Sequence, residues 1–358
     1  MKENKTKKVV VAMSGGVDSS VSALLLKEQG YAVIGLHMRG ENKTTRDDDE
    51  NRVREICEKL NIPLEVVDYS NQMQIVKNYF ISEYKAGRTP NPCVICNREV
   101  KFKPFIEFAE KLGADYFATG HYARIIHDGN NHVLLKAVDE NKDQSYFLCK
   151  LSNKQLEKAL FPLGEITKDK VREIARENGL ISADTKESYD ICFLGSEKFK
   201  DFMNKNYPEK SGDMIDLKTG KVVGQHIGIS KYTIGQRKGL GIGGGHGETG
   251  ESWFVSRKDA EKNIIYVSQG NGEELYSSGI ISKDFNWLAK IPNNETFNVK
   301  AKFRYRQKDQ DVKVSVDNDG IVNIIFKEPQ RAITLGQFVV LYDNDVCLGG
   351  GAISEVIK

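Results

Sequence analysis

The first 200 or so residues alternate between short apolar runs and longer amphipathic stretches. Four runs have the length and apolar character of strands, at residues 9–13, 31–38, 64–68 and 116–119. Four stretches carry apolar positions at helical spacing, at residues 17–28, 49–60, 102–112 and 168–178. Strands that alternate with helices favour a parallel sheet covered on both faces. We therefore predict a doubly wound α/β domain in this part of the chain.

The pattern changes after about residue 205. Residues 211–275 are rich in glycine and hold only short strand-like runs, at 253–255 and 264–267. Beyond them the chain consists of strand-length runs and turns, with strands expected at 296–306, 311–317, 321–326, 332–335 and 338–342. This texture predicts a small antiparallel β-barrel. We expect a catalytic domain at 1–204, a small central domain at 205–275 and the barrel at 276–358.

Composition limits the classes of protein that the chain can belong to. Its 358 residues suffice for two or three domains, each with its own core. The net charge is +2, so a surface that binds nucleic acid has to be a local patch. No apolar run approaches the length of a membrane span, and the six cysteines are spread unevenly, unlike a disulfide framework. We expect a cytoplasmic enzyme that binds no membrane.

The loop after the first strand is the strongest chemical signal. Residues 14–20 read Ser-Gly-Gly-Val-Asp-Ser-Ser and join a buried strand to a helix. Such a turn directs backbone N–H groups and the positive end of the helix dipole at one point, where a polyphosphate fits. Asp18 is placed to reach Mg²⁺ directly or through water. Neither a Walker-type loop nor a dinucleotide fingerprint is present. The run resembles the pyrophosphatase loop of enzymes that cleave ATP between the α- and β-phosphates.

Three cysteines draw attention. Cys93 and Cys96 follow two prolines, and we expect an extended loop that presents both thiols. A structural zinc site needs a second pair of ligands, and the sequence lacks one at suitable spacing. We interpret the pair as reactive thiols. Cys192 lies between apolar residues and is equally consistent with a reactive thiol and with a core residue. The other cysteines are expected in the core, at Cys57, Cys149 and Cys347.

Two basic segments suit a phosphodiester backbone. A strand over residues 300–308 would place five basic side chains on one face, Lys300, Lys302, Arg304, Arg306 and Lys308. A face of a single sign favours phosphate binding. The glycine-rich segment 233–244 is a second candidate, with a surface connector as the alternative. The acidic run Asp47–Glu50 we interpret as the solvated start of a helix, with its role left open.

Together these motifs resemble the bacterial tRNA-specific 2-thiouridylases, which make 2-thiouridine at the wobble position of certain tRNAs. The resemblance covers almost the whole chain, with motifs in order at 14–20, 87–102, 120–124, 142–148, 191–195, 232–244 and 304–306. It implies ATP and Mg²⁺, tRNA as partner, and a sulfur-relay protein or cysteine desulfurase as donor. The alternatives are a synthetase acting on a small molecule, which the basic strand and paired thiols disfavour, and an RNA-binding module with a vestigial nucleotide site.

The resemblance also assigns roles to single residues. Cys96 would be the nucleophile and Cys192 would carry a persulfide. ATP would be bound by Ala12, Met13, Ser14, Gly15, Gly16, Val17, Asp18, Ser19, Met38 and Gly120. The flipped target base would be bordered by Asn91, Pro92 and Cys93. The tRNA would be contacted by His121, Lys142, Asp143, Gln144, Arg304, Tyr305 and Gln337.

The implied chemistry is adenylation of the uridine C2 oxygen, followed by sulfur transfer from the Cys192 persulfide to C2. Cys93 departs from many members of the family, in which we expect Asp. With this third thiol, Cys93, Cys96 and Cys192 would be able to hold three irons of a [4Fe–4S] cluster whose fourth iron binds sulfide. The persulfide route and the cluster route both remain open at this stage.

Overall fold

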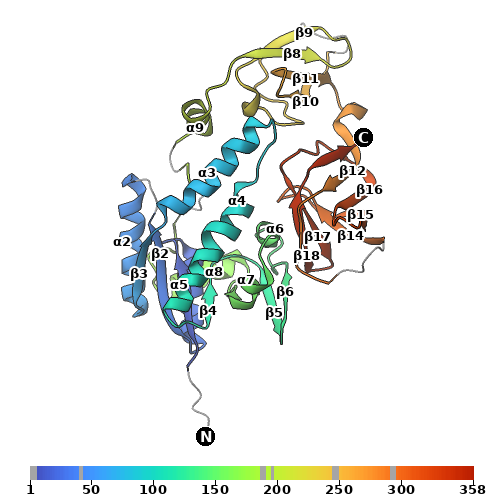
Figure 1. Cartoon of the computed structure of the whole chain (residues 1–358). Coiled ribbons are helices and arrows are strands. Elements are labelled where there is room, and N and C mark those ends of the chain that lie inside the picture. The colour runs from blue at the N-terminus through green and yellow to red at the C-terminus, as the bar shows by residue number, and fades with distance from the viewer. Residues whose placement is uncertain (1–5, 40–42, 186–190, 195–196, 244–249, 291–295) are drawn as a thin grey trace.

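The computed structural model describes residues 6–39, 43–185, 191–194, 197–243, 250–290 and 296–358, and of residues 43–47 only the helical backbone. The described residues form three sheets (Figure 1). Two of the predicted motifs end at Gly195 and Gly244, which lie outside the described residues. The same holds for the side chain of Asp47 in the acidic run.

The first sheet is parallel and has the strand order β3-β2-β1-β4-β7. Its strands are β1 (Lys8–Met13), β2 (Ala32–Arg39), β3 (Leu64–Asp68), β4 (Tyr116–Ala118) and β7 (Ala159–Leu160). The main helices around it are α1 (Val17–Glu28), α2 (Lys43–Leu60), α3 (Ser70–Lys85), α5 (Lys103–Lys111) and α8 (Lys168–Glu177). No helix in the described ranges is both long enough and apolar enough to cross a membrane.

The two faces of this sheet supply two separate hydrophobic cores. In β1, Val10 packs into one core, whereas Val9 and Val11 pack into the other. Side chains of a strand alternate between faces, so a strand that is apolar throughout must be covered on both sides. The doubly wound α/β fold predicted from the sequence is confirmed.

The second sheet is small and has the order β10-β11-β8-β9. Helix α9 (Phe199–Asn206) precedes it, and its strands are β8 (Gly212–Asp216), β9 (Val222–His226), β10 (Trp253–Asp259) and β11 (Ile264–Gln269). Short 3₁₀ turns at Ile229–Lys231 and Glu273–Leu275 flank these strands. Figure 1 shows this domain beyond one end of α3.

The last sheet is antiparallel and curls into a barrel. Its strands are β12 (Tyr276–Ser282), β13 (Phe285–Trp287), β14 (Phe297–Lys302), β15 (Gln310–Val316), β16 (Val322–Arg331), β17 (Phe338–Asp343), β18 (Val346–Ala352) and β19 (Glu355–Ile357). β12 pairs with β16, and β13, which follows it directly, pairs with β18 at the other end of the sheet. The consecutive strands β12 and β13 therefore connect the two ends of the sheet. The sheet closes around one core, and the predicted β-barrel is confirmed.

Two strands predicted in the barrel are wrong in extent. The run 296–306 leaves the sheet at Lys302, because residues 304–307 form a turn closed by the bond from the Gln307 N–H to the Arg304 carbonyl. Residues 332–335 form no strand, and Ala332 has a φ of +57°. The five basic residues at 300–308 thus do not share one strand face.

The barrel sits on the first domain through a shared core. Phe338, Val340 and Tyr342 of the barrel pack in the same apolar cluster as Phe102, Phe105 and Phe117, with Leu288 and Cys347. The hairpin of β5 (Arg124–Asp128) and β6 (Asn131–Leu135) extends the barrel sheet where Leu135 pairs with Val346. The short helices α6 (Ser145–Leu148) and α7 (Asn153–Lys158) lie beside this junction (Figure 1).

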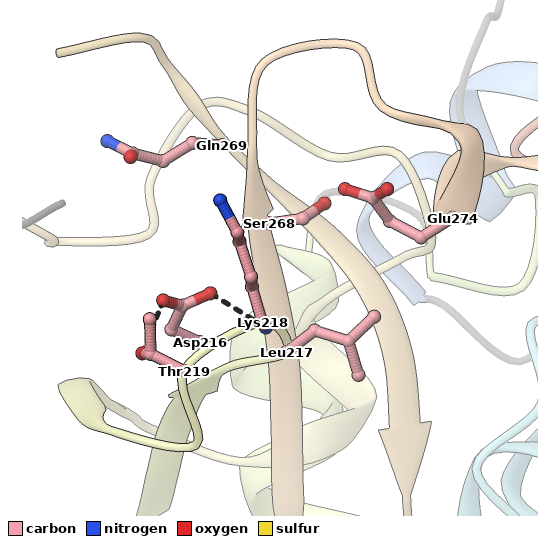
Figure 2. Close-up of a pocket in the computed structure, with 7 residues that line it drawn as sticks. All are labelled: Asp216, Leu217, Lys218, Thr219, Ser268, Gln269 and Glu274. Carbon is pink, nitrogen blue, oxygen red and sulfur yellow. Dashed lines mark hydrogen bonds between the residues drawn. The ribbon is translucent and has the colours of Figure 1, made fainter. Parts of the chain in front are cut away.

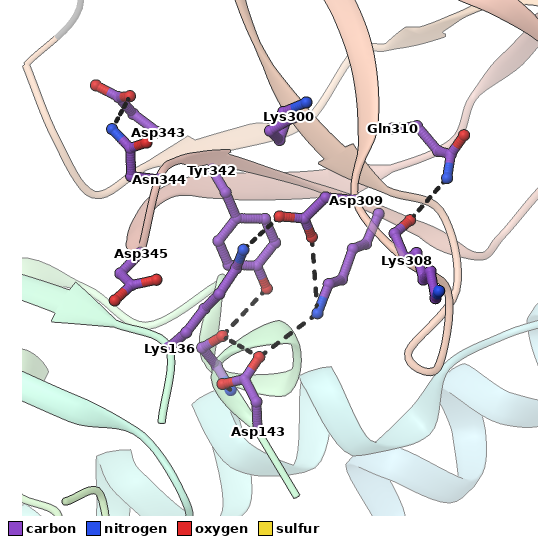
Figure 3. Close-up of polar contacts among 12 residues, drawn as sticks. Lys136, Asp143, Lys300, Lys308, Asp309, Gln310, Tyr342, Asp343, Asn344 and Asp345 are labelled. Carbon is purple, nitrogen blue, oxygen red and sulfur yellow. Dashed lines mark hydrogen bonds and ion pairs between the residues drawn. The ribbon is translucent and has the colours of Figure 1, made fainter. Parts of the chain in front are cut away.

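A network of charged side chains crosses the same junction (Figure 3). Buried Asp143 accepts hydrogen bonds from the backbone N–H groups of Ala137 and Ser145, each at 3.1 Å. Lys302 Nζ of the barrel lies 3.7 Å from Asp143 and 3.8 Å from Asp309. Lys136 Nζ donates to Asp309 at 2.5 Å. Two lysines and two carboxylates thus neutralise one another between the domains.

Replacing Asp143 with Ala should destabilise this junction. The substitution removes the acceptor of two buried backbone donors and one counter-charge of Lys302, a loss of about 3 kcal/mol. Chemical denaturation followed by fluorescence measures it. As the control, Asp345→Ala removes the exposed partner of Arg124, an effect below about 1 kcal/mol. Equal shifts for the two variants would contradict the assigned role of the network.

Candidate nucleotide and thiol site

The loop between β1 and α1 has the geometry of an anion site. Gly15 adopts a φ of +79°, and a Cβ there would lie 3.3 Å from the Asp49 carbonyl oxygen, so this position requires glycine. The Ser14 N–H donates to Ser19 Oγ at 3.2 Å, which closes the turn. Among the described residues no side chain caps α1 at Gly16. Its first backbone N–H groups are therefore available to a ligand.

The other residues predicted to bind ATP lie at the same edge of the sheet. Ala12 and Met13 end β1, and Met38 lies near the end of β2, at the carboxyl ends where ligands of such sheets bind. Gly120 follows β4, and a Cβ on it would lie 2.9 Å from the backbone of Asp18 and Ser19. The loop after β4 therefore packs directly on the start of α1.

Asp18, the predicted Mg²⁺ ligand, is held by two side chains that the sequence analysis did not single out. Lys168 Nζ lies 2.7 and 2.8 Å from its two carboxylate oxygens, and the Tyr122 hydroxyl donates to Oδ1 at 2.7 Å. Lys168 is the first residue of α8, where the helix dipole disfavours a cation. That unfavourable position was the one signal in the sequence that pointed to it.

The segment with Cys93 and Cys96 is helical, and the predicted extended loop is wrong. Asn91 is extended, helix α4 (Pro92–Ile95) follows, and a π-helix, η1 (Cys96–Phe102), continues it. Proline is favourable at the first position of a helix, since its missing N–H would have no partner there. Cys93 and Cys96 are about one helical turn apart, and they differ in burial: Cys93 is exposed, whereas Cys96 is 3% exposed.

Cys96 and Cys192 form a hydrogen-bonded pair of free thiols. The Cys96 thiol donates to the Cys192 sulfur, and this bond, with the nearby Lys101 ammonium, lowers the pKa of Cys192. The same bond, together with burial, raises the pKa of Cys96. Cys192, which is exposed, is therefore the thiolate near neutral pH, and Cys96 keeps the proton. Their exposure gives the two sulfurs different access to an incoming partner.

Lys101 is the second functional candidate that the sequence analysis missed. In an α-helix the residue five positions after Cys96 would point roughly 140° away. A π-helix closes its hydrogen bonds from i to i+5, which brings Lys101 toward the side of Cys96. Burial lowers the pKa of Lys101, but its interactions with Cys96, Cys192 and Cys93 outweigh this and raise it. The Lys101 ammonium thus interacts electrostatically with all three thiols and favours their ionised forms.

The nucleotide loop and the thiols are neighbours. Met38 packs against the apolar cluster that contains Cys96, together with Phe193 beside Cys192. His121 directly follows Gly120, and burial and the Lys101 charge hold its pKa well below its usual value. Residues 120–121 therefore contact the loop on one side and lie near the thiol centre on the other. The separate motifs meet at one edge of the parallel sheet.

The three thiols are candidate ligands of an iron–sulfur cluster. Within the described ranges, no three His, Cys, Asp or Glu side chains surround a position for one metal ion. Cys93, Cys96 and Cys192 nevertheless gather around Lys101 and influence one another electrostatically. A cluster binds each thiolate through a different iron, so its ligands need not converge on one ion. The donor set is consistent with a cluster.

Several residues predicted to contact tRNA join the barrel to the thiol region. Gln337 Nε2 donates to the carbonyls of Thr89 and Pro90 at 2.8 and 3.3 Å. Tyr305 lies against Phe147, with ring centroids 4.3 Å apart. Asp143 is buried in the domain junction. The roles of these residues in binding tRNA stay predictions, as do those of Lys142, Gln144 and Arg304, whose guanidinium donates to the Ala332 carbonyl.

Two hollows lie in the central domain. One, of about 240 Å³, is lined by Asp216, Leu217, Lys218, Thr219, Ser268, Gln269 and Glu274 (Figure 2). The other, of about 420 Å³, is lined by Arg237, Leu240 and Ile242, from the glycine-rich segment predicted to follow a phosphodiester backbone, and by Trp253 of β10 among others. Neither contains a residue of the thiol or nucleotide site.

Family models match most of the chain. The tRNA methyl transferase HUP domain matches residues 7–196, the tRNA methyl transferase PRC-barrel domain matches 200–269, and the aminomethyltransferase beta-barrel domain matches 277–353. A solved structure, the U34-tRNA thiolase NcsA from Methanococcus maripaludis with its [4Fe-4S] cluster, is 20% identical with a TM-score of 0.36. It covers 56% of this chain and 67% of its own, and carries no weight in the assignment.

Curated relatives match over their full length. The tRNA-specific 2-thiouridylase MnmA of Oceanobacillus iheyensis is 50% identical over 367 residues, covering all of this chain and 98% of that protein. The tRNA-specific 2-thiouridylase MnmA of Alkaliphilus oremlandii is 49% identical and covers all of both chains. With half of its residues shared along its whole length, this chain belongs to the tRNA-specific 2-thiouridylase family of enzymes.

Proposed function

We propose that this protein catalyses the ATP-dependent 2-thiolation of the wobble uridine of tRNA. The observation that carries the proposal is the meeting of the phosphate-binding loop with the Cys96–Cys192 pair at one edge of the sheet. Membership of the family supports the choice of tRNA as substrate. A synthetase for small molecules would have no use for a paired, proton-sharing set of thiols beside its nucleotide loop.

The first step activates the base. The C2 oxygen of uridine attacks the α-phosphorus of ATP, the bond to the β-phosphate oxygen breaks, and the proton on N3 passes to water. Adenylation converts a poor leaving oxygen into AMP. The loop Ser14–Val17 supplies N–H groups to the phosphates, and Asp18 is the residue that would hold Mg²⁺. The target base has to leave the stack to reach this site.

The second step brings sulfur to C2. The Cys192 thiolate attacks the terminal sulfur of a persulfide on a sulfur-relay protein or cysteine desulfurase, whose own thiolate leaves. The exposure and low pKa of Cys192 suit this exchange with an external partner. The terminal sulfur then attacks C2 and AMP departs. Cys96 attacks the Cys192 sulfur, which releases 2-thiouridine and leaves a disulfide for an external thiol to reduce. In the alternative order, Cys96 first attacks the Cys192 sulfur of the persulfide, which releases sulfide and leaves the disulfide. The sulfide then attacks C2, and AMP departs.

A cluster is the second way to use the same residues. Cys93, Cys96 and Cys192 would hold it, and when bound it would supply an open iron at which sulfide binds. The observation that favours it is the third thiol, Cys93, beside the same ammonium. Lys101 would then compensate the negative charge of the three thiolates.

Incubation with ATP, Mg²⁺, unmodified tRNA and a cysteine desulfurase with free cysteine, which supplies persulfide sulfur, should yield 2-thiouridine, detected by mass spectrometry. Cys96→Ser should abolish the product and leave the affinity for tRNA unchanged in a gel shift, because only the reacting sulfur is lost. Cys57→Ala, which alters a thiol of another apolar cluster, is the control and should remain active. Turnover of ATP to AMP without tRNA would favour the synthetase alternative.

The reactivity of Cys192 should follow its lowered pKa. A lowered pKa raises the thiolate fraction near neutral pH, so the alkylation rate of Cys192 should rise with a midpoint below the ordinary thiol value of about 8.5. Iodoacetamide labelling and peptide mass spectrometry measure this rate separately from that of Cys93. Cys96→Ala and Lys101→Met should each move the midpoint upward, since each removes a group that stabilises the thiolate. A midpoint near 9 in the unaltered protein rules out the assignment.

Reconstitution tests the cluster. Anaerobic incubation with iron and sulfide should give a brown protein with charge-transfer absorbance, and Cys93→Ser should reduce the bound iron. Electron paramagnetic resonance of the reduced sample reports cluster formation apart from activity. A colourless, iron-free protein with full activity would exclude this route and leave the persulfide route.

A further inference from the structure

Cys93 is a third thiol beside the reacting pair, and the persulfide route does not use it. It is the second residue of α4, and the Cys96 N–H donates to its carbonyl, so the two residues are one helical turn apart. Side chains at this spacing have Cβ atoms about 5–6 Å from each other. Cys192 is hydrogen-bonded to Cys96 and interacts electrostatically with Cys93. The three sulfurs therefore form one cluster, with the Lys101 ammonium beside them.

The three sulfurs differ in how well an incoming group can reach them. Cys93 and Cys192 are exposed, whereas Cys96 is buried in an apolar cluster with Val76 and Val100. The rate at which a thiolate opens a disulfide depends on which sulfur it attacks and on access to that sulfur. In a disulfide between Cys96 and Cys192, the accessible sulfur is therefore that of Cys192. A neighbouring exposed thiol is well placed to attack it.

We propose that Cys93 is a catalytic residue of the persulfide route, the resolving thiol that opens the Cys96–Cys192 disulfide left by each sulfur transfer. The inference rests on the proposed function. The Cys93 thiolate attacks the Cys192 sulfur, and a new S–S bond forms between them. The Cys96–Cys192 bond breaks, its electron pair leaves with the Cys96 sulfur, and Cys96 takes up the proton that Cys93 gave up. One disulfide replaces another, so this exchange needs neither an oxidant nor a reductant.

The exchange moves the disulfide onto two exposed sulfurs. An external dithiol can attack either sulfur of a Cys93–Cys192 disulfide, whereas a Cys96–Cys192 disulfide offers it one accessible sulfur. The dithiol supplies two electrons and two protons, becomes a disulfide itself, and returns Cys93 and Cys192 to thiols. The buried Cys96 regains its thiol inside the apolar cluster before the reductant acts. The external reductant therefore never has to reach the interior of the site.

Disulfide mapping in the full-length protein tests the exchange. The protein is freed of metal with a chelator, oxidised with diamide, alkylated and analysed as peptides by mass spectrometry. The wild-type protein should carry mainly a Cys93–Cys192 disulfide, with Cys96 as a free thiol. Cys93→Ala should carry the Cys96–Cys192 disulfide instead, and dithiothreitol should reduce it about tenfold more slowly, because access to one sulfur is lost. Cys57→Ala, which removes a buried thiol of another apolar cluster, is the control and should match the wild type.

Cys96→Ala tests whether the two exposed sulfurs reach each other. This variant should still form the Cys93–Cys192 disulfide, since that bond does not involve Cys96. Failure to form it, or a wild-type protein whose disulfide always includes Cys96, overturns the inference. Equal rates of reduction in the wild type and in Cys93→Ala overturn it as well. A Cys93→Ala protein in which Cys96 and Cys192 form no disulfide with each other instead contradicts the persulfide route of the proposed function.

Discussion

The packing of the barrel against the parallel-sheet domain is the constraint on which the site depends. The thiol helix 92–102 lies between the two, and it is held from both sides. Gln337 of the barrel binds the carbonyls just before it, and Asn97 donates to the Phe147 carbonyl. Phe147 in turn packs against Tyr305 of the barrel. If the barrel shifted, Cys96 and Lys101 would lose the supports that aim them at Cys192.

Two lysines lie at this edge of the sheet, the buried Lys168 and the half-buried Lys101. Lys101 faces the sulfurs and Lys168 faces Asp18 at the phosphate loop, each approaching its anionic partner from the protein side. His121 lies between the two centres and stays neutral, since burial and the Lys101 charge oppose its protonation. Positive charge is therefore concentrated beside the two sets of acidic side chains at this edge, the thiols and Asp18. The near-neutral net charge of the whole chain conceals this local arrangement.

The apolar pattern of the sequence predicted helices and strands correctly where local forces decide the structure. The limits of α1 and β3 follow from apolar periodicity and match the structure at both ends. Pattern was insufficient at 92–102, where the prolines suggested an extended loop. Burial of Val94 and Val100 against neighbouring elements stabilises the helix instead. The strand at 296–306 failed for a related reason, because a turn at 304–307 interrupts an alternation that continues in the sequence.

The same distinction explains which site residues the sequence revealed. Loop glycines and paired cysteines are recognisable because the function of such motifs depends on the spacing of the residues along the chain. Lys101 becomes recognisable only through the π-helix, and Lys168 only through a contact with Asp18, 150 residues away in sequence.

In the proposed persulfide route, the unequal exposure of the two sulfurs sets the order in which they act. An external donor can reach Cys192, which carries the negative charge, while Cys96 is buried and protonated. Sulfur must therefore arrive first on Cys192. Once Cys192 bears a persulfide, its sulfur no longer has the charge that attracted the Cys96 proton, and the Lys101 ammonium then favours ionisation of Cys96. In this route, loading one cysteine prepares the other to attack it, and the Lys101 ammonium supports both steps.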